Sequence, residues 1–368
     1  MDIEELLRFT VERGASDLHL KVGNVPFIRV DGELQPTHFE ALTPADTEAF
    51  ANVLMSEHKK REFLASSEAD LGSTLSGVGR FRVNVFRQRG MVGLAIRRVR
   101  SEIPTFEELR LPPVLAKLAD SPRGLVLVTG PTGTGKTTTI ASMIGHINST
   151  RRAHIVTIED PIEVVHDDDR AIIQQREVGL DTDRYAAALR HVVRQDPDVI
   201  FVGEIRDPES ALSAIQAAET GHLVISTMHT IDSTETINRL LDLFPPSQQR
   251  EVRSSFAGSL RGIVAQRLVQ RADGKGRVPA VEVLVNTGRV FDRIVDPDET
   301  DSIPEVIAEG DYYGMQTFDQ ALVQLVKEGL VAEDEARRTS TNPHDFDLAL
   351  MGVMDRRSST RASTVPTI

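Results

Sequence analysis

The chain opens with apolar residues at helical spacing. Residues 3–11 carry them on one face, which predicts a short amphipathic helix that ends near Gly14. Apolar and polar residues alternate between positions 18 and 30, and Asp31-Gly32 is suited to a turn with positive φ. This stretch therefore predicts antiparallel strands.

A second helix is predicted from Thr43 to about Lys60. Thr43 is a good N-cap and Pro44 suits the first helical position. Residues 78–100 return to the alternation of strands. Together these elements predict a compact α+β domain over residues 1–100.

A linker is predicted over residues 101–113, which contain three prolines. Thr105 and Glu108 have the spacing of a capping box, so the linker should run into a new helix.

The middle of the chain alternates continuous apolar strands with helical segments, which predicts a parallel sheet covered by helices on both faces. We assign this α/β core to residues 114–288. Residues 289–350 follow a helical pattern, and residues 351–368, rich in Ser, Thr and Arg, are predicted to be disordered. The core strands are predicted at residues 125–129, 155–158, 199–202 and 223–227.

Length and composition limit the number of domains and the kinds of ligand that this protein can bind. The 368 residues allow two or three domains at roughly 100–200 residues each. A net charge of −13 repels polyanions, so any basic site must be local and we expect no nucleic-acid partner. The absence of cysteine excludes disulfides and thiolate metal sites, and we expect no zinc.

The N-terminal segment lacks the basic and apolar regions of an export signal. The apolar runs are strand-sized, far from the roughly 18 residues of a membrane span. We expect a cytoplasmic protein that reaches a membrane only through a partner.

A phosphate-binding loop follows the predicted strand 125–129. Its residues match G-x-x-x-x-G-K-[ST] and lead directly into a helical segment, which is the context that the pattern requires. Backbone N–H groups and Lys136 should hold the phosphates of ATP, and Thr137 should supply a ligand to Mg²⁺. The residues expected at the nucleotide are Gly130, Pro131, Thr132, Gly133, Thr134, Gly135, Lys136, Thr137 and Thr138.

Two acids follow predicted strands at the same edge of the sheet. Glu159, with Asp160, ends strand 155–158, and Glu204 follows strand 199–202. We assign Glu159 as the base that orients water and Glu204 to the Mg²⁺ ion or its waters. The sequence alone also allows the two roles to be exchanged.

Two histidines flank the strand 223–227. His229 lies where a γ-phosphate sensor should lie, and about 3.3 Å per residue keeps His222 from reaching the same phosphate. His222 is left with two equal interpretations: contact with another subunit, or capping of the preceding helix.

Residues 80–100 contain seven arginines and no acid, in a chain of net negative charge. A nucleic-acid groove is disfavoured because the chain has no Trp and is acidic. Arginine fingers that reach a neighbouring subunit's nucleotide are the preferred interpretation, although at least half should be ordinary exposed strand residues. The seven are Arg80, Arg82, Arg87, Arg89, Arg97, Arg98 and Arg100.

Four motifs occur in the order found in secretion-superfamily ATPases: Walker A, Asp box, Walker B and His box. Residues 79–84 and 313–319 also resemble patterns of one branch, the PilT family of type IV pilus retraction ATPases. The four motifs lie at residues 130–137, 157–163, 194–207 and 220–230.

The resemblance implies an α/β fold with a RecA-like P-loop ATPase core, a smaller PAS-like α+β N-terminal domain and C-terminal helices. It implies a homohexamer docked under an inner-membrane pilus platform protein, with Mg-ATP hydrolysis driving pilus retraction, pilus disassembly and twitching motility. It also implies that Glu159 and Glu204 are essential, and that Arg80, Arg82 and Arg97 contact nucleotide in trans.

One segment departs from that family. Where retraction ATPases carry Ala-Ile-Arg-Asn-Leu-Ile-Arg-Glu, residues 289–296 keep little beyond the aliphatic spacing. An accessory pilus or secretion ATPase paralogue with weak or regulatory activity is therefore the alternative. A nucleic-acid translocase is a further alternative, which the acidic charge disfavours, and a GTPase is disfavoured because no Asn-Lys-x-Asp tetrapeptide occurs.

Overall fold

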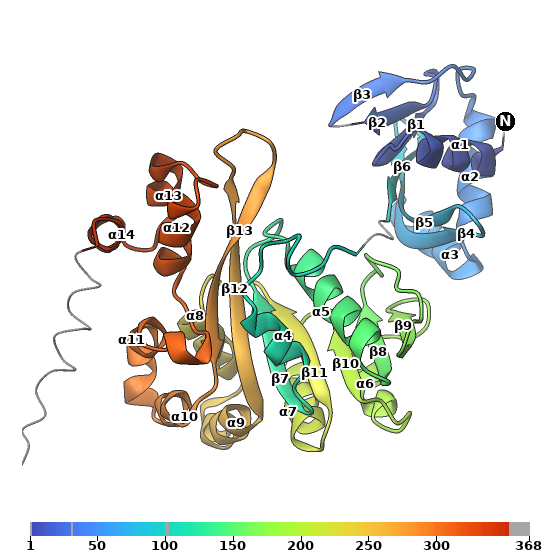
Figure 1. Ribbon diagram of the computed structural model, residues 1–368. Coiled ribbons are helices and arrows are strands. Elements are labelled where there is room, and N and C mark those ends of the chain that lie inside the picture. The colour runs from blue at the N-terminus through green and yellow to red at the C-terminus, as the bar shows by residue number, and fades with distance from the viewer. Residues whose placement is uncertain (1, 31, 100–102, 353–368) are drawn as a thin grey trace, which may run out of the picture. The chain divides into compact units, whose positions relative to one another are not determined.

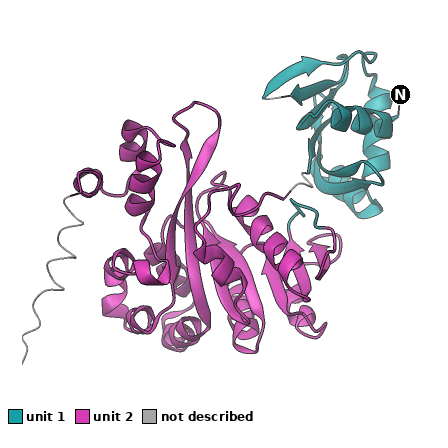
Figure 2. Ribbon diagram, viewed as in Figure 1, with its two compact units in different colours: residues 1–102, 160–166 teal, residues 103–159, 167–368 magenta. Residues whose placement is uncertain are grey.

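A computed structural model describes residues 2–30, 32–99 and 103–352 (Figure 1). The chain divides into two compact units, and each has its own sheet (Figure 2). Unit 1 comprises residues 1–102 and 160–166, and unit 2 comprises residues 103–159 and 167–368. Among the described residues, no helix is long and apolar enough to cross a membrane.

Unit 1 is built on a six-stranded antiparallel sheet in the order β3-β2-β1-β6-β5-β4. Three helices pack against it, and Leu6, Phe50 and Phe63 from these helices join one buried cluster with the strand residues Phe81 and Val83. The elements are α1 (Ile3–Glu12), β1 (Asp17–Lys21), β2 (Phe27–Val30), β3 (Glu33–Pro36), α2 (Pro44–Leu54), α3 (Glu57–Ser66), β4 (Glu68–Leu75), β5 (Gly79–Gln88) and β6 (Met91–Arg98).

The single helix predicted from Thr43 to Lys60 is wrong, because the structure has two. Thr43 forms the expected capping box, but Met55 is extended and ends the first helix. The side chain of Ser56 then accepts a hydrogen bond from the backbone N–H of Lys59 and caps a second helix. Strands β3 and β4 were not predicted, since few of their residues are buried.

Unit 2 is built on a seven-stranded sheet in the order β13-β12-β7-β11-β10-β8-β9. Helices α4 and α5 cover one face and α6 to α9 the other (Figure 1). The elements are α4 (Val114–Ala119), β7 (Gly124–Thr129), α5 (Lys136–Thr150), β8 (His154–Glu159), β9 (Ile172–Glu177), α6 (Tyr185–Val192), β10 (Val199–Val202), α7 (Pro208–Glu219), β11 (Leu223–Met228), α8 (Ser233–Asp242), α9 (Pro246–Ser259), β12 (Leu260–Gln270) and β13 (Arg277–Val285).

The four predicted core strands are confirmed, but the sheet is mixed rather than parallel throughout. Strand β12 runs parallel to β7, and β13 returns antiparallel to β12. This hairpin was missed because polar residues such as Gln266, Arg267 and Glu282 interrupt its apolar pattern. The hairpin extends the sheet next to β7, the strand that leads into the glycine-rich loop.

The capping box predicted at Thr105 lies within the linker and does not begin a helix. Thr105 and Glu108 do form both capping-box hydrogen bonds, at 2.8 and 3.2 Å. Residues 106–110 nevertheless form turns, and Arg110 has a φ of 55°. The helix α4 starts only at Val114.

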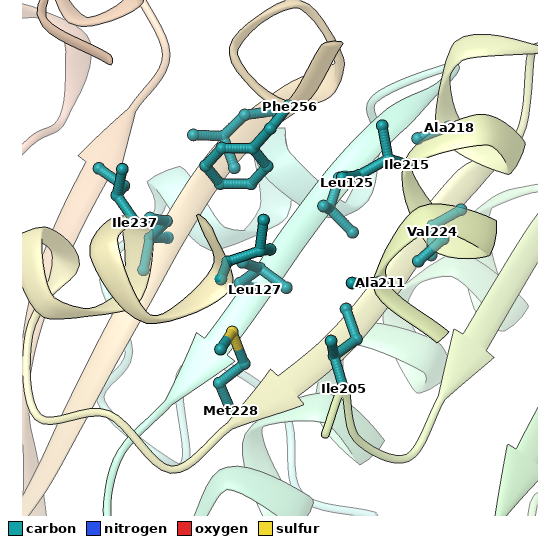
Figure 3. Close-up of a cluster of buried hydrophobic side chains, with 14 of the residues drawn as sticks. Leu125, Leu127, Ile205, Ala211, Ile215, Ala218, Val224, Met228, Ile237 and Phe256 are labelled. Atoms are coloured by element: carbon teal, nitrogen blue, oxygen red, sulfur yellow. The ribbon is translucent and has the colours of Figure 1, made fainter. Parts of the chain in front are cut away.

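The main core of unit 2 lies between the sheet and helices α6 to α9. Leu125 and Leu127 on β7 contact this layer, with Ile215 from α7, Ile237 from α8 and Phe256 from α9 (Figure 3). All five are buried. Because apolar contacts cover both faces of β7, the strand that carries the glycine-rich loop is held rigidly.

The predicted helical region after the core is confirmed, and its last three helices pack on the far end of the β12–β13 hairpin. Of the predicted disordered end, residues 353–368 lie outside the described residues, as does Arg100. The elements are α10 (Gly288–Val295), η1 (Pro297–Ser302), α11 (Ile303–Ala308), η2 (Asp311–Tyr313), α12 (Phe318–Lys327), α13 (Glu333–Thr339) and α14 (Pro343–Leu350).

Candidate nucleotide site

Four neighbouring parallel strands bring the candidate residues to one edge of the unit 2 sheet. Strands β7, β11, β10 and β8 pair in that order, with Thr129 beside Met228 and Val202 beside both Ser226 and Ile158. Their carboxyl ends lead into the glycine-rich loop, His229, Glu204 and Glu159 in turn. Ligands of open α/β sheets bind outside such strand ends.

The glycine-rich loop leaves β7 and enters α5. Gly135, the N-cap of α5, has a φ of 90°, and no side chain caps the helix. A helix start without a side-chain cap suits an anion such as phosphate, which its first N–H groups can bind. Thr137 and Thr138 are exposed beside them, so their hydroxyl groups are accessible to a ligand and its metal.

Lys136 is buried against the loop that precedes it. Its Nζ donates hydrogen bonds to the carbonyl oxygens of Gly130, at 2.6 Å, and Pro131, at 3.1 Å. Thr134 Oγ1 also donates to the Pro131 carbonyl, at 2.9 Å. The ammonium group therefore lies inside the curve of the loop, where the oxygens of a bound phosphate would compete with these carbonyls for its protons.

Glu204 and His229 form a pair at the ends of β10 and β11. His229 Nε2 lies 3.1 Å from Glu204 Oε2, and Arg206 makes an ion pair with Glu204 Oε1. The Glu204 side chain is only 10% exposed, whereas that of His229 is 51% exposed. One member of the pair is thus fixed and the other faces solvent.

Two hydroxyl groups tie these strand ends together. Ser226 Oγ donates to the carbonyl of Val202 at 2.7 Å, and Thr227 Oγ1 donates to the carbonyl of Gly203 at 2.6 Å. The backbone around Glu204 and His229 is therefore held on both sides.

Glu159 ends β8 and is buried. Its Oε1 accepts hydrogen bonds from Thr157 Oγ1, at 2.7 Å, and from Gln175 Nε2, at 3.0 Å. Its strand is three positions from β7, or about 14 Å at the usual strand spacing. Glu159 and Glu204 share the edge, and Glu204 lies on the nearer strand.

His222 lies at the opposite end of β11 from His229. Its Nδ1 is 2.9 Å from the carbonyl oxygen of Ala217, in the last turn of α7. The contact matches the capping interpretation left open by the sequence.

The three arginines expected to act in trans lie in unit 1. Arg80 donates to Thr74 Oγ1 at 3.1 Å, and Arg82 Nη1 lies 3.7 Å from Glu163 Oε1. Arg97 Nε donates to Asp17 Oδ1 at 2.8 Å.

The contact with Arg97 favours the charged form of Asp17. Burial opposes ionisation of Asp17, yet hydrogen bonds from Ser16 and Arg97 hold the pKa of this carboxyl below its usual value. The Arg97 side chain remains 72% exposed. It keeps most of its surface available while it neutralises Asp17.

Several side chains at this edge were given no role from sequence. Arg206 and Gln175 contact the two candidate acids, and Thr157 supports Glu159. Arg206 and Thr157 lie inside the recognised motifs, but spacing gives no sign of which acid they contact. Gln175 comes from β9, so only the pairing of β8 with β9 reveals it.

A glycine-rich loop at the edge of this sheet, followed by a helix that no side chain caps, defines a P-loop ATPase with a RecA-like core. The model of the type II/IV secretion system protein family matches residues 94–357. The chain belongs to this family and is an ATPase of its PilT branch.

Relatives and a solved structure are similar to this chain along almost its whole length. The type IV pilus retraction ATPase PilT of Pseudomonas aeruginosa is 42% identical over 94% of this chain and 100% of its own. The type IV pilus ATPase PilU of the same organism is 41% identical over 95% and 91%. A crystal structure of the pilus retraction motor PilT with bound ADP superposes with a TM-score of 0.86, at 44% identity over 94% of this chain and 98% of that one.

Proposed function

We propose that this ATPase is a motor that powers type IV pilus retraction. The observation that carries the proposal is the near full-length similarity to the retraction ATPase PilT, whose solved relative binds ADP. The geometry of the strand edge supports ATP hydrolysis, since it brings together a phosphate loop and buried carboxylates, which can hold the nucleotide, its metal ion and the attacking water.

The loop residues 130–138 would hold ATP, and Thr137 with Glu204 would hold Mg²⁺, which neutralises phosphate charge when bound. The donor set fits both groups, because N–H groups, a lysine, an exposed hydroxyl and a carboxylate converge on one edge. Glu159 orients water, His229 senses the γ-phosphate, and Arg80, Arg82 and Arg97 act on a neighbouring subunit's nucleotide.

The assembly proposed is a homohexamer at the cytoplasmic face of the inner membrane, held there by a pilus platform protein. In each subunit, residues 1–100 form the N-terminal domain and residues 114–288 the motor core. The similarity to a protein described as a retraction motor supports this arrangement.

An accessory pilus ATPase is the second candidate. PilU and PilT match this chain almost equally, at 41% and 42% identity. Helix α10, which replaces the characteristic helix of retraction ATPases, is the segment that favours the second candidate.

The first experiment measures ATP hydrolysis by the purified protein at matched oligomeric state. We expect wild type to turn over ATP and Glu204→Gln to lower kcat by about 100-fold or more, since the fixed carboxylate is lost. Glu209→Gln is the control, because Glu209 pairs with Arg184 and Arg190 at the surface. Full activity in Glu204→Gln would contradict the assigned site.

The second experiment separates the two candidates. The gene is expressed in a piliated bacterium that lacks its own retraction ATPase, and the length and retraction of pili are measured. Restored retraction supports the motor. An active ATPase that leaves pili unretracted supports the accessory function instead.

A further inference from the structure

A glutamine on β12 contacts both the glycine-rich loop and the helix α5 that follows it. Gln266 Nε2 donates a hydrogen bond to the carbonyl oxygen of Thr134, inside the loop, at 2.7 Å. Its Oε1 accepts from Thr139 Oγ1, on the first turns of α5, at 2.7 Å. The residue is only 3% exposed, in a strand that is otherwise largely apolar. Both polar atoms of this buried amide are therefore used to connect the loop to the helix.

The position of Gln266 follows from the register of the sheet. Strand β12 runs parallel to β7, and Ala265 lies beside Thr129, the last residue before the loop. Gln266 is thus one residue further, where the chain beside it leaves the sheet. Strand β12 continues beyond the end of β7, so it supports the loop that follows β7.

Two loop glycines are packed against the same residue. A Cβ on Gly130 would lie 2.6 Å from the carbonyl oxygen of Gln266, and one on Gly135 would lie 2.9 Å from its Nε2. Both glycines also have positive φ, 143° and 90°. The loop thus lies directly on Gln266 at its two ends, with no room for a side chain between.

We propose that Gln266 is a positioning residue for nucleotide binding: it holds the glycine-rich loop in its phosphate-binding shape without touching the nucleotide. The proposal rests on the proposed function, in which this loop is the phosphate site. The Thr134 carbonyl and the Gly135 N–H belong to one planar peptide, so the hydrogen bond from Gln266 fixes the direction of that N–H group as well. Without it, the loop loses preorganisation, which lowers affinity rather than the rate of the chemical step.

The test is calorimetric titration of the full chain with ADP. Gln266→Met keeps the length of the side chain and removes both hydrogen bonds, and we expect it to weaken ADP binding about tenfold. Thr139→Val removes only one bond and should weaken binding about threefold. Because both act through one contact, the double variant should bind like Gln266→Met alone. The kcat at saturating ATP should stay within about twofold of wild type.

The matched control is Gln249→Met. Gln249 Nε2 donates to the carbonyl of Phe244 at 3.0 Å, on α9, so this variant loses a comparable bond away from the loop. It should leave ADP affinity unchanged. Thermal unfolding without nucleotide reports any general loss of stability, and Thr139→Val carries the test if Gln266→Met does not fold.

The outcomes distinguish the role proposed for Gln266 from the proposal that the loop is the phosphate site. Wild-type ADP affinity in Gln266→Met, or in Thr139→Val if only that variant folds, would overturn the role of Gln266, as would equal weakening in Gln249→Met. Lys136→Ala tests the site itself. If Lys136→Ala binds ADP normally, the loop is not the phosphate site and both proposals fall. If it loses binding while Gln266→Met does not, only the role of Gln266 falls.

Discussion

Glu282 is a carboxyl group that the fold buries almost completely on β13. It is 8% exposed, and burial raises its pKa, although the hydrogen bond from the backbone N–H of Ser233 acts in the opposite direction. Its Oε1 accepts the backbone N–H of Ser233, at 2.8 Å, at the start of α8. The residue thus fixes the segment that follows His229, at the cost of keeping an acid away from water.

The sign of this shift predicts how stability depends on pH. The folded-state pKa of Glu282 is raised, so its contribution is full below its ordinary value of 4.5 and is lost as pH rises through the folded pKa. Glu282→Gln keeps an oxygen acceptor for Ser233 and cannot ionise. Above pH 4.5, the free energy of unfolding of this variant minus that of wild type should therefore increase as pH rises.

Urea unfolding of both proteins from pH 4 to pH 8 measures this difference. The surface variant Glu209→Gln should follow wild type at every pH. Parallel curves for Glu282→Gln and wild type would show that Glu282 does not titrate as proposed.

At the scale of elements, helix α10 replaces the characteristic helix of retraction ATPases yet packs in an ordinary way. Thr287 caps it, and Val290 and Ile294 are fully buried in the core. Phe291 and Val295 are 36% and 38% exposed. The altered sequence therefore preserves the inner face of the helix and leaves apolar side chains on its outer face.

Substitutions on the two faces should differ in their effect on stability. Ile294→Ala should lower the free energy of unfolding by about 2–5 kcal/mol, because it leaves a cavity in the core. Phe291→Ala should lower it by less than about 1 kcal/mol and leave ATP hydrolysis unchanged. Denaturant unfolding and the ATPase assay check both. Equal losses would mean that α10 packs differently from this structure.

The β12–β13 hairpin contacts the glycine-rich loop, the start of α8 and the C-terminal helices. One face presents Gln266 to the loop, and the other presents Glu282 to the start of α8. The guanidinium carbon of Arg267, on β12, lies 3.9 Å from the ring centroid of Phe318. Arg267 Nη1 also donates a hydrogen bond to the carbonyl oxygen of Thr339. Two segments of the nucleotide site and the C-terminal helices thus share one support.

At the scale of the whole molecule, the proposal that arginines from another subunit complete the site predicts the effects of two substitutions. Arg82→Ala should lower ATP hydrolysis at least tenfold, because an arginine finger stabilises transition-state charge. Lys136→Ala should also be inactive. Mixed together, the two variants should recover part of the activity, since some interfaces then join an intact loop to an intact arginine.

The control for this mixing experiment is Arg8→Ala, an exposed arginine on α1. It should remain active alone. If Arg82→Ala is inactive and mixing restores nothing, Arg82 acts within its own subunit or only supports the fold through Glu163.

The sequence by itself determined the class of this ATPase, most of its elements and the residues of its loop. Glycine spacing, strand ends and caps are local features, so they can be read from neighbours in the chain. The separate helix at Ser56, the hairpin at the sheet edge and the bonds from Gln175 and Gln266 were decided only by the tertiary structure. They depend on which strands pair, and polar residues in buried strands show no local sign of the distant backbone group that they will bind.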